Sequence, residues 1–225
     1  MSRVLTIPDL HLPVAHPRAL DFCIDVYNKH RCDTVVFIGD IVDHHAISFH
    51  DKNPNCPSAK EEYLAVGEQL KWWLGTFPNA TVTIGNHDDR PERMASNKGG
   101  IPDVYLRTYR ELWDTPGWQW AFDTEIDDVY YFHGVGSTGK TPALNKTDSV
   151  HMSVVMGHVH SVAGVHWGAG PKARWFGMDV SCLIDRRAWQ FTYGKHAKKK
   201  PILGCGVVLD GIPYYEIMPL EKYKE

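Results

Sequence analysis

Residues 34–43 of this chain read TVVFIGDIVD. The first part, from Thr34 to Ile38, is β-branched and aromatic, which is typical of a buried strand. Gly39 and Asp40 end this run abruptly, and Asp43 follows three residues later. A carboxylate directly after a strand lies at one edge of a sheet, where neighbouring strands can bring further polar groups beside it.

Four other stretches repeat this arrangement of a short apolar run followed by Asp, Asn or His. They are Asp9-Leu10-His11, Gly85-Asn86-His87-Asp88, His133-Gly134 and Gly157-His158-Val159-His160. Each stretch is a weak signal alone, because Asp and His are common in loops. Together they supply the carboxylate, amide and imidazole ligands that a two-metal phosphoester-cleaving site needs.

Strand and helix signals alternate in the first half of the chain. Strands are expected at 4–7, 34–38 and 80–84, with a helix over 17–30 between the first two. Ser58 with Glu61 three positions later is a capping box, which predicts the start of a second helix. This alternation favours βαβ units and a largely parallel sheet.

The second half changes character. Short strand-like runs at 129–132, 154–156, 162–165 and 206–209 have little helix between them, apart from a helix predicted over 142–150. Asp210-Gly211 between two alternating runs predicts a β-hairpin. We therefore expect a mixed α/β fold whose second half is more antiparallel. No linker or repeat divides the 225 residues, so residues 1–225 are predicted to form one domain.

Composition limits the function classes. A net charge of -3 gives no global field that would draw the chain onto nucleic acid, so a nucleic-acid substrate would need a local patch. Five cysteines without a CxxC pair argue against a disulfide framework and favour a reducing compartment. No segment approaches 18 apolar residues, and Pro8 interrupts any signal-peptide run. The expected location is cytoplasmic, with no membrane partner.

The five motifs resemble those of the calcineurin-like metallophosphoesterase superfamily. That superfamily carries Asp-x-His, Gly-Asp-x-x-Asp, Gly-Asn-His-Asp/Glu, a His often followed by Gly, and Gly-His-x-His in this order. The resemblance covers positions 9 to 160. It implies an αββα sandwich of two mixed β-sheets flanked by helices, with two divalent metal ions at the strand ends. Manganese is the expected metal, and iron, zinc or nickel suit the same oxygen and imidazole ligands.

The resemblance also assigns ligands to the two metals. One metal would be held by Asp9, His11, Asp40 and His160. Asp40 would bridge to the second metal, whose other ligands would be Asn86, His133 and His158. A hydroxide that bridges the two ions would attack phosphorus in line.

Two further residues are implied to be catalytic. His87 would stabilise the transition state or protonate the leaving oxygen, since an imidazole can deliver a proton near neutral pH. Asp88 would orient His87 and stabilise its charge. Arg90 and His45 are candidate substrate contacts, because both lie next to motif residues, and Lys140 is a third.

The substrate is less constrained than the reaction class. Protein phosphatases of the superfamily carry Arg-Gly after the second motif, whereas His44-His45 stand here, which weakens a phosphoprotein substrate. We expect a phosphodiesterase acting on a small phosphoester or nucleotide, with nucleic-acid ends as a further candidate substrate. The alternatives are a phosphomonoesterase acting on nucleotides or phosphoproteins, and a non-catalytic metal-binding interaction scaffold. The oligomeric state is open.

Two other sequence patterns suggest different functions, a phosphate-binding loop and a group of tryptophans. Residues 134–141 satisfy Gly-x-x-x-x-Gly-Lys-Thr, the phosphate loop of nucleotide hydrolases, but Pro142 and the lack of a Walker-B strand argue against an ATPase. Tryptophans at 113, 118 and 120 favour core packing, with a base-stacking wall or a lid as the alternative.

Overall fold

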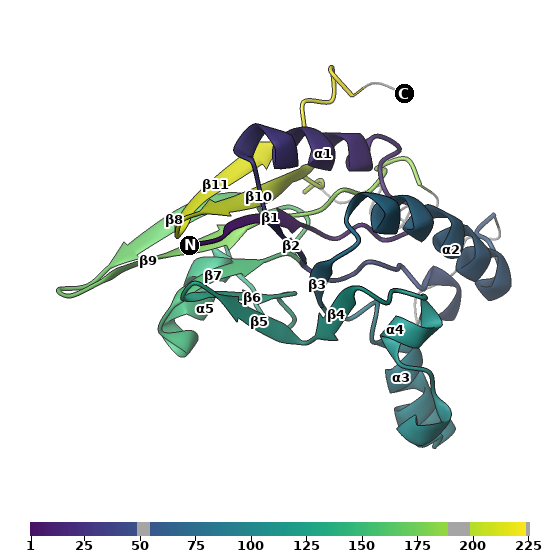
Figure 1. Cartoon of the computed structure of the whole chain (residues 1–225). Helices are drawn as coiled ribbons and strands as arrows, with labels where there is room; N and C mark the ends of the chain where they lie inside the picture. Colours follow the sequence, from purple (N-terminus) through teal and green to yellow (C-terminus); the bar gives the residue numbers. More distant parts are fainter. Residues whose placement is uncertain (49–54, 189–198, 224–225) are drawn as a thin grey trace.

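Two β-sheets packed face to face form the centre of the computed structural model, and helices cover their outer faces (Figure 1). The structure describes residues 1–48, 55–188 and 199–223. The expected αββα sandwich of mixed sheets is confirmed. Among the described residues no helix has the length and apolar character needed to cross a bilayer.

The first sheet contains the strands that the opening motifs follow. Its order is β11 (Ile212–Ile217), β10 (Gly204–Leu209), β1 (Arg3–Ile7), β2 (Thr34–Phe37), β3 (Ala80–Thr83) and β4 (Trp118–Ala121). Neighbours from β1 to β4 pair in parallel, as the alternation of strands and helices predicts. Strand β10 runs antiparallel to β1 and forms a hairpin with β11. Asp210 and Gly211 make its turn with φ of 51° and 80°, which confirms the hairpin signal.

The second sheet is built from the later part of the chain. Its order is β5 (Asp123–Ile126), β6 (Val129–Phe132), β7 (Ser153–Met156), β9 (Arg174–Asp179) and β8 (Gly164–Ala169). Strands β6, β7 and β9 are parallel, whereas the pairs β5–β6 and β8–β9 are antiparallel. The strands β4, β5 and β9 were not expected, because polar residues or glycine interrupt their apolar residues and leave no clear apolar run.

Helices of very different length connect the strands. The longer ones are α1 (Ala19–His30), α2 (Ala59–Thr76) and α5 (Pro142–Val150). The shorter ones are α3 (Arg90–Met94), α4 (Tyr109–Leu112), η1 (His45–Ile47), η2 (Ala95–Gly99) and η3 (Asp103–Tyr105). Ser58 and Glu61 form the predicted capping box at the start of α2. Figure 1 shows α3 and α4 projecting from the edge of the sandwich beyond β4.

Three separate clusters of buried side chains correspond to the three interfaces between layers. Because successive residues of a strand face opposite sides, β1 places Val4 between the two sheets and Leu5 against the helices. Met156 on β7 belongs to the third cluster, under α5. Trp113 and Trp118 are buried in the largest cluster, so the expectation of core packing is right for these two residues. The five cysteines are free thiols.

Candidate metal centre

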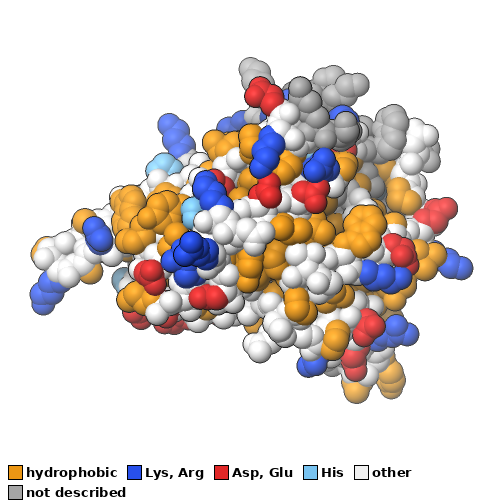
Figure 2. Space-filling view, turned by 45° about the horizontal axis from the view of Figure 1, so that its top comes forward, with side chains coloured by type: hydrophobic (Ala, Val, Ile, Leu, Met, Phe, Trp, Pro, Cys, Tyr) orange, Lys and Arg blue, Asp and Glu red, His pale blue; other side chains and the backbone are white. Residues whose placement is uncertain are grey.

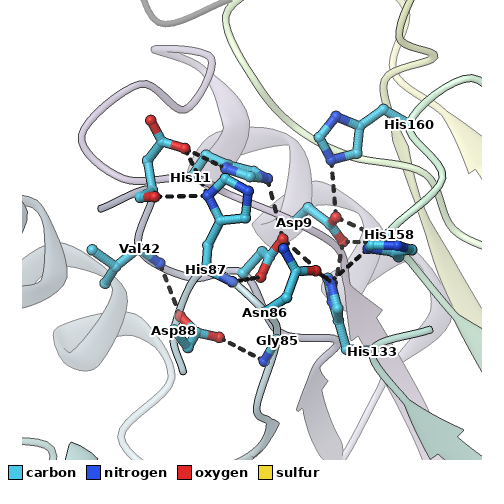
Figure 3. Close-up of polar contacts among 12 residues, drawn as sticks. Asp9, His11, Val42, Gly85, Asn86, His87, Asp88, His133, His158 and His160 are labelled. Carbon is cyan, nitrogen blue, oxygen red and sulfur yellow. Dashed lines mark hydrogen bonds and ion pairs between the residues drawn. The ribbon is translucent and has the colours of Figure 1, made fainter. Parts of the chain in front are cut away.

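The loops that follow β1, β2, β3, β6 and β7 meet at one end of the sandwich (Figure 3). The strands deliver these loops together because each of the five runs ends at the same edge of its sheet. The loops carry all of the predicted metal ligands: Asp9, His11, Asp40, Asn86, His133, His158 and His160. That these side chains bind metal stays a prediction, and the arrangement of their donor atoms is described below.

Several of these residues adopt an unusual backbone conformation. His11, Asp40 and His158 have φ of 49°, 46° and 67°, in the left-handed region that residues other than glycine rarely occupy. Such strain is tolerated where the surroundings require one side-chain direction, and it clusters at functional sites. Figure 3 shows the side chains of His11 and His158 in one cluster, and Oδ2 of Asp40 lies 3.6 Å from Nε2 of His11.

The carboxylate of Asp40 lies between the two predicted ligand sets. Its Oδ1 accepts a hydrogen bond from the backbone N–H of His87 at 2.8 Å. Its Oδ2 lies 3.2 Å from Nε2 of His133 and 3.6 Å from Nε2 of His11. One oxygen therefore faces an imidazole of each set, which is the position that a bridging carboxylate requires.

His133 shows how a backbone contact selects the ligand nitrogen. Its Nδ1 donates to the carbonyl of Ile38 at 2.7 Å, so the proton of the neutral ring lies on Nδ1 and Nε2 is free to coordinate. Nε2 lies 3.2 Å from Oδ1 of Asn86 and 3.2 Å from Nδ1 of His158. Burial lowers the pKa of His133, but the charges of Asp40 and Asp9 outweigh it and raise this pKa to about 10. A cation is strongly favoured at this point, whether a proton or a metal ion.

Asp9 organises the other side of the centre. Its Oδ2 lies 3.0 Å from Nε2 of His160 and accepts from the backbone N–H of His158 at 3.1 Å. Ser181 donates from its hydroxyl to the carbonyl of His160 at 2.6 Å, which holds the backbone of that residue in place. Asp9 is therefore tied to both histidines of the last motif.

Two donor clusters coincide with the two predicted metal sites. The first is Asp9, His11 and His160, and the second is Asp40, His133 and His158, with the donor atoms of each cluster within 4.8 Å of one another. A third group, His11, Asp40 and His87, overlaps both. The donors are oxygen and imidazole nitrogen without thiolate, which suits divalent manganese, iron, zinc or nickel.

Glycines make room for the carboxylates of this centre. A Cβ atom on Gly85 would lie 2.1 Å from Oδ1 of Asp40, and one on Gly157 would lie 2.2 Å from Oδ1 of Asp9. Both contacts are far shorter than any real Cβ contact, so only glycine permits these carboxylate positions. The ligand types, their proximity and these two glycines together fit a pair of divalent metal ions.

The ring of His87 contacts Asp43. His87 donates from Nδ1 to the backbone carbonyl of Asp43 at 2.7 Å, and the same nitrogen lies 3.0 Å from Oδ1 of Asp43. Asp88 instead accepts from the backbone N–H groups of Val42 and Gly85, at 3.1 and 3.0 Å (Figure 3). These hydrogen bonds of Asp88 go to the backbone of neighbouring loops, and that Asp88 orients His87 and stabilises its charge stays a prediction.

Asp43 belongs to the second motif, and no role was predicted for it from the sequence. Its Oδ1 also accepts from Nδ1 of His11 at 2.8 Å, so one carboxylate holds a predicted ligand and the predicted acid. Burial raises the pKa of Asp43, but hydrogen bonds from His11 and His87 outweigh it and hold this pKa well below its usual range. The signal was present in the sequence, since Gly-Asp-x-x-Asp contains two carboxylates at a fixed spacing.

Arg90 is turned into the protein. Its guanidinium donates to the carbonyls of Asp43 and His44 at 2.9 and 2.8 Å, and the residue is only 6% exposed. His45 is also buried, and its Nδ1 lies 3.9 Å from Oδ2 of Asp43. In this structure both residues support the loop of Asp43, and their contact with substrate stays a prediction.

The phosphate-loop pattern leads to a helix whose N-terminus is already occupied. The carboxylate of Asp179 on β9 accepts from the backbone N–H of Ala143 at 3.2 Å, and Pro142 before it has no N–H. A buried carboxylate at this position opposes the binding of a phosphate there. Lys140 is exposed on the turn before α5, and its contact with substrate stays a prediction.

Comparison with known proteins identifies a family for most of the chain. Residues 2–182 match the family described as calcineurin-like phosphoesterase. No curated protein matches the sequence.

Similar solved structures include Vacuolar Protein Sorting 29 from Cryptosporidium parvum, with 10% identity and a TM-score of 0.45 over 96% of each chain. YfcE, a phosphoesterase from E. coli, is 11% identical with a TM-score of 0.45, covering 99% of this chain and 95% of its own. A nuclease, MPE from Pseudomonas putida, is 12% identical with a TM-score of 0.35, covering 94% and 86%. Likenesses at these scores support no inference about activity.

Proposed function

The chain belongs to the calcineurin-like phosphoesterase family, and we propose that it is a hydrolase that cleaves phosphodiesters with the help of two divalent metal ions. Nucleotide-type substrates are favoured, and manganese is the proposed metal. The alternative within the same class is a phosphomonoesterase.

The position of Asp40 carries this proposal. One carboxylate oxygen faces His133 at 3.2 Å and His11 at 3.6 Å, so it lies between two clusters that each contain ligands for a divalent ion. An isolated metal-binding site needs no such shared carboxylate. A pair of metals close together is typical of sites that clamp the attacking and leaving oxygens of a phosphoester.

The residues divide into two ligand sets. Asp9, His11, Asp40 and His160 would hold one metal, and Asp40, Asn86, His133 and His158 the other. When bound, the metals supply Lewis acidity, which activates water at neutral pH and neutralises charge that develops on the phosphate oxygens. The chain supplies the geometry through the hydrogen bonds that orient each ligand.

His87 is proposed to protonate the leaving oxygen. Its Nδ1 proton is engaged by the carbonyl of Asp43, so the ring can turn only its Nε2 toward the substrate. The backbone N–H of His87 is held by Asp40, which links the position of the ring to that of the bridging ligand. A general acid fixed in this way contributes about 10²–10⁴-fold to a rate.

Preference for a diester over a monoester follows from the cations around the site. A monoester carries more negative charge and benefits from arginines that clamp its oxygens. Arg90 is buried and donates to two backbone carbonyls, and Arg93 pairs with Asp89 at 3.0 Å while it donates to the carbonyl of Asn86. Both guanidinium groups are already engaged by protein groups, so neither is positioned to clamp phosphate oxygens. This supports the phosphodiester, which carries less negative charge than the monoester.

Hydrolysis of a bis-aryl phosphodiester and of the corresponding aryl monoester, measured side by side, tests the proposal. We expect metal-dependent turnover in Mn²⁺ that is faster for the diester and that disappears with a chelator. Asp40→Asn should abolish turnover, while the exposed Asp148→Asn should retain it.

Two other results would contradict a phosphodiesterase. Faster cleavage of the monoester would assign the protein as a phosphatase. Metal binding by calorimetry without turnover of either ester would contradict an enzyme and favour the metal-binding scaffold.

A further inference from the structure

His44 contacts the residue that we propose as the general acid. It follows Asp43 directly in the chain and lies outside the ligand sets of the two metals. Its Nδ1 donates to the backbone carbonyl of His87 at 2.8 Å. In return, Nδ1 of His87 donates to the backbone carbonyl of Asp43 at 2.7 Å. The two loops therefore hold each other, each through one imidazole.

The backbone of His87 is fixed at both of its polar groups. Its N–H donates to Oδ1 of Asp40 at 2.8 Å. Its carbonyl accepts from the ring of His44 at 2.8 Å and from the backbone N–H of Arg90 at 3.2 Å. The contact with His44 is the shorter one and joins residues 43 positions apart. Without it, the carbonyl would keep only the bond from the turn that follows His87.

His44 is itself held in place. Its ring centroid lies 5.8 Å from that of Trp113, which is buried. The backbone N–H groups of the two residues after His44 donate to the carboxylate of Glu62 on α2, at 2.8 and 3.0 Å. Because both the ring and the following backbone are anchored, His44 can impose a position on the loop of His87.

His44 also remains uncharged near neutral pH. Burial lowers its pKa to about 4; the hydrogen bond to the carbonyl of His87 opposes this shift, and the charges of Arg90 and His87 add to it. A neutral imidazole with its proton on Nδ1 can donate to a carbonyl without placing a second positive charge beside the proposed acid.

We propose that His44 is a positioning residue of the phosphoester-cleaving reaction, which sets the ring of His87 for proton transfer by holding its carbonyl. This inference rests on the proposed function. Proton transfer requires the donor to lie within hydrogen-bond reach of the leaving oxygen, and a displacement of about 1 Å can cost on the order of 10²-fold in rate. The donor clusters found among the described residues do not include His44, so its effect should be limited to the step that uses His87.

Substitutions at position 44 separate the hydrogen bond from the backbone conformation. His44→Ala removes the donor. His44→Asn keeps it, because an amide N–H takes the place of the Nδ1–H, and asparagine tolerates the left-handed φ of 49° at this position. His44→Gly also removes the donor and suits this backbone, so it takes the place of His44→Ala if that variant does not fold.

The chain also has histidines at its surface, some of which Figure 2 shows in pale blue, and a surface histidine provides the matched control. His151 is exposed and has φ of 57°, so His151→Ala places alanine at the same kind of backbone position as His44→Ala. It lies before β7, whereas the motif that contributes to the metal centre follows this strand. The two alanine variants therefore share the backbone strain but not the contact with His87.

The first measurement compares kcat for an alkyl phosphodiester and for the bis-nitrophenyl ester in Mn²⁺. The alkoxide has to be protonated as it leaves, whereas nitrophenolate does not. We expect His44→Ala to lower kcat for the alkyl ester by up to about 10²-fold, with a much smaller loss on the nitrophenyl ester. His44→Asn should regain most of this loss, and His151→Ala should match the wild type on both esters.

The second measurement is the histidine side-chain NMR spectrum of chelated, ¹⁵N-labelled protein, which needs no turnover. The Nδ1–H signals of His44 and His87 should exchange slowly with water, because both protons lie in hydrogen bonds to carbonyls. In His44→Ala the His87 signal should shift and exchange faster. In His44→Asn and His151→Ala it should stay close to its wild-type position.

Three results would overturn this inference. They are losses of equal size on both esters in His44→Ala, a defect in His44→Asn as large as that in His44→Ala, and an unaltered His87 signal in His44→Ala. Absence of metal-dependent hydrolysis of either ester by the wild type would instead overturn the proposed function.

Discussion

Oδ1 of Asp43 lies 3.0 Å from Nδ1 of His87, and the same oxygen accepts from Nδ1 of His11 at 2.8 Å. The carboxylate therefore links the proposed acid to a proposed metal ligand. Both ring orientations depend on this one side chain, which is almost completely buried. A change at Asp43 is expected to affect catalysis and metal affinity together.

Asp43→Asn tests this link. The amide keeps the size of the side chain but removes the charge that both imidazoles face. We expect metal affinity and kcat each to fall by about 10–100-fold, as for other residues that orient metal ligands. Calorimetric titration with Mn²⁺ measures the first and steady-state kinetics the second. Loss of kcat with unchanged metal affinity would contradict a role in holding His11.

His87→Ala should have an effect that depends on the leaving group. A nitrophenolate leaves without a proton, whereas an alkoxide needs one, so a general acid matters only for the second. We expect a fall in kcat of about 10²–10⁴-fold for an alkyl phosphodiester and a much smaller fall for the bis-nitrophenyl ester. Equal losses on both substrates would exclude protonation by His87 and favour stabilisation of the transition state.

Asp88→Asn should affect stability more than chemistry. The Asp88 carboxylate accepts from the N–H groups of Val42 and Gly85, and the amide can replace only one of these acceptors. We expect the free energy of unfolding to fall by about 1–3 kcal/mol. The dependence of kcat on the leaving group should stay as in the wild type. Loss of that dependence would support Asp88 as a residue that orients His87.

Gly157→Ala should disrupt the centre through the position of Asp9. The new Cβ would lie 2.2 Å from Oδ1 of Asp9, so the carboxylate has to move. We expect a large loss of Mn²⁺ affinity by calorimetry. Gly67→Ala on α2 is the control, because no atom lies within 4 Å of its Cβ and alanine favours a helix by about 0.5–1 kcal/mol. Unchanged metal binding in Gly157→Ala would exclude Asp9 as a ligand in this position.

Asp179 should make stability depend on pH. Its carboxyl is buried under α5, and burial raises its pKa from 3.8 to about 7. Between these values the unfolded chain has lost the proton while the folded protein keeps it, so the contribution to stability is complete below about pH 4 and is lost as the pH rises through 7. Asparagine at this position cannot ionise.

Thermal or urea unfolding in a chelator at pH 4 and pH 8 measures this effect. Relative to the wild type, Asp179→Asn should gain stability on the order of 3 kcal/mol from the lower to the higher pH. Asp148→Asn, which replaces an exposed carboxylate on α5, is the control variant. A difference that does not change with pH would show that Asp179 ionises normally in the folded protein.

Much of the fold could be predicted because its signals are local. The run of Thr34 to Ile38 ending at Gly39, the capping box of Ser58 and Glu61, and the turn at Asp210-Gly211 each depend on neighbouring residues, and each forms as expected. The strands β4 and β9 were not predicted, because they are stabilised by pairing with β3 and β7, which lie further away in sequence. The strand β5 was missed because its four residues, DTEI, contain only one apolar side chain, although it pairs locally with β6.

The sequence by itself determined that the five motifs gather at one end of the sandwich, since apolar runs that end in Gly, Asp, Asn or His place those side chains at strand ends. Only the tertiary structure decided how they pair. It directs His87 to Asp43, turns Arg90 inward, and places Asp179 at the N-terminus of α5. These contacts join residues 36 to 47 positions apart, and a hydrogen-bond partner at that separation depends on how the loops approach one another in space rather than on local spacing.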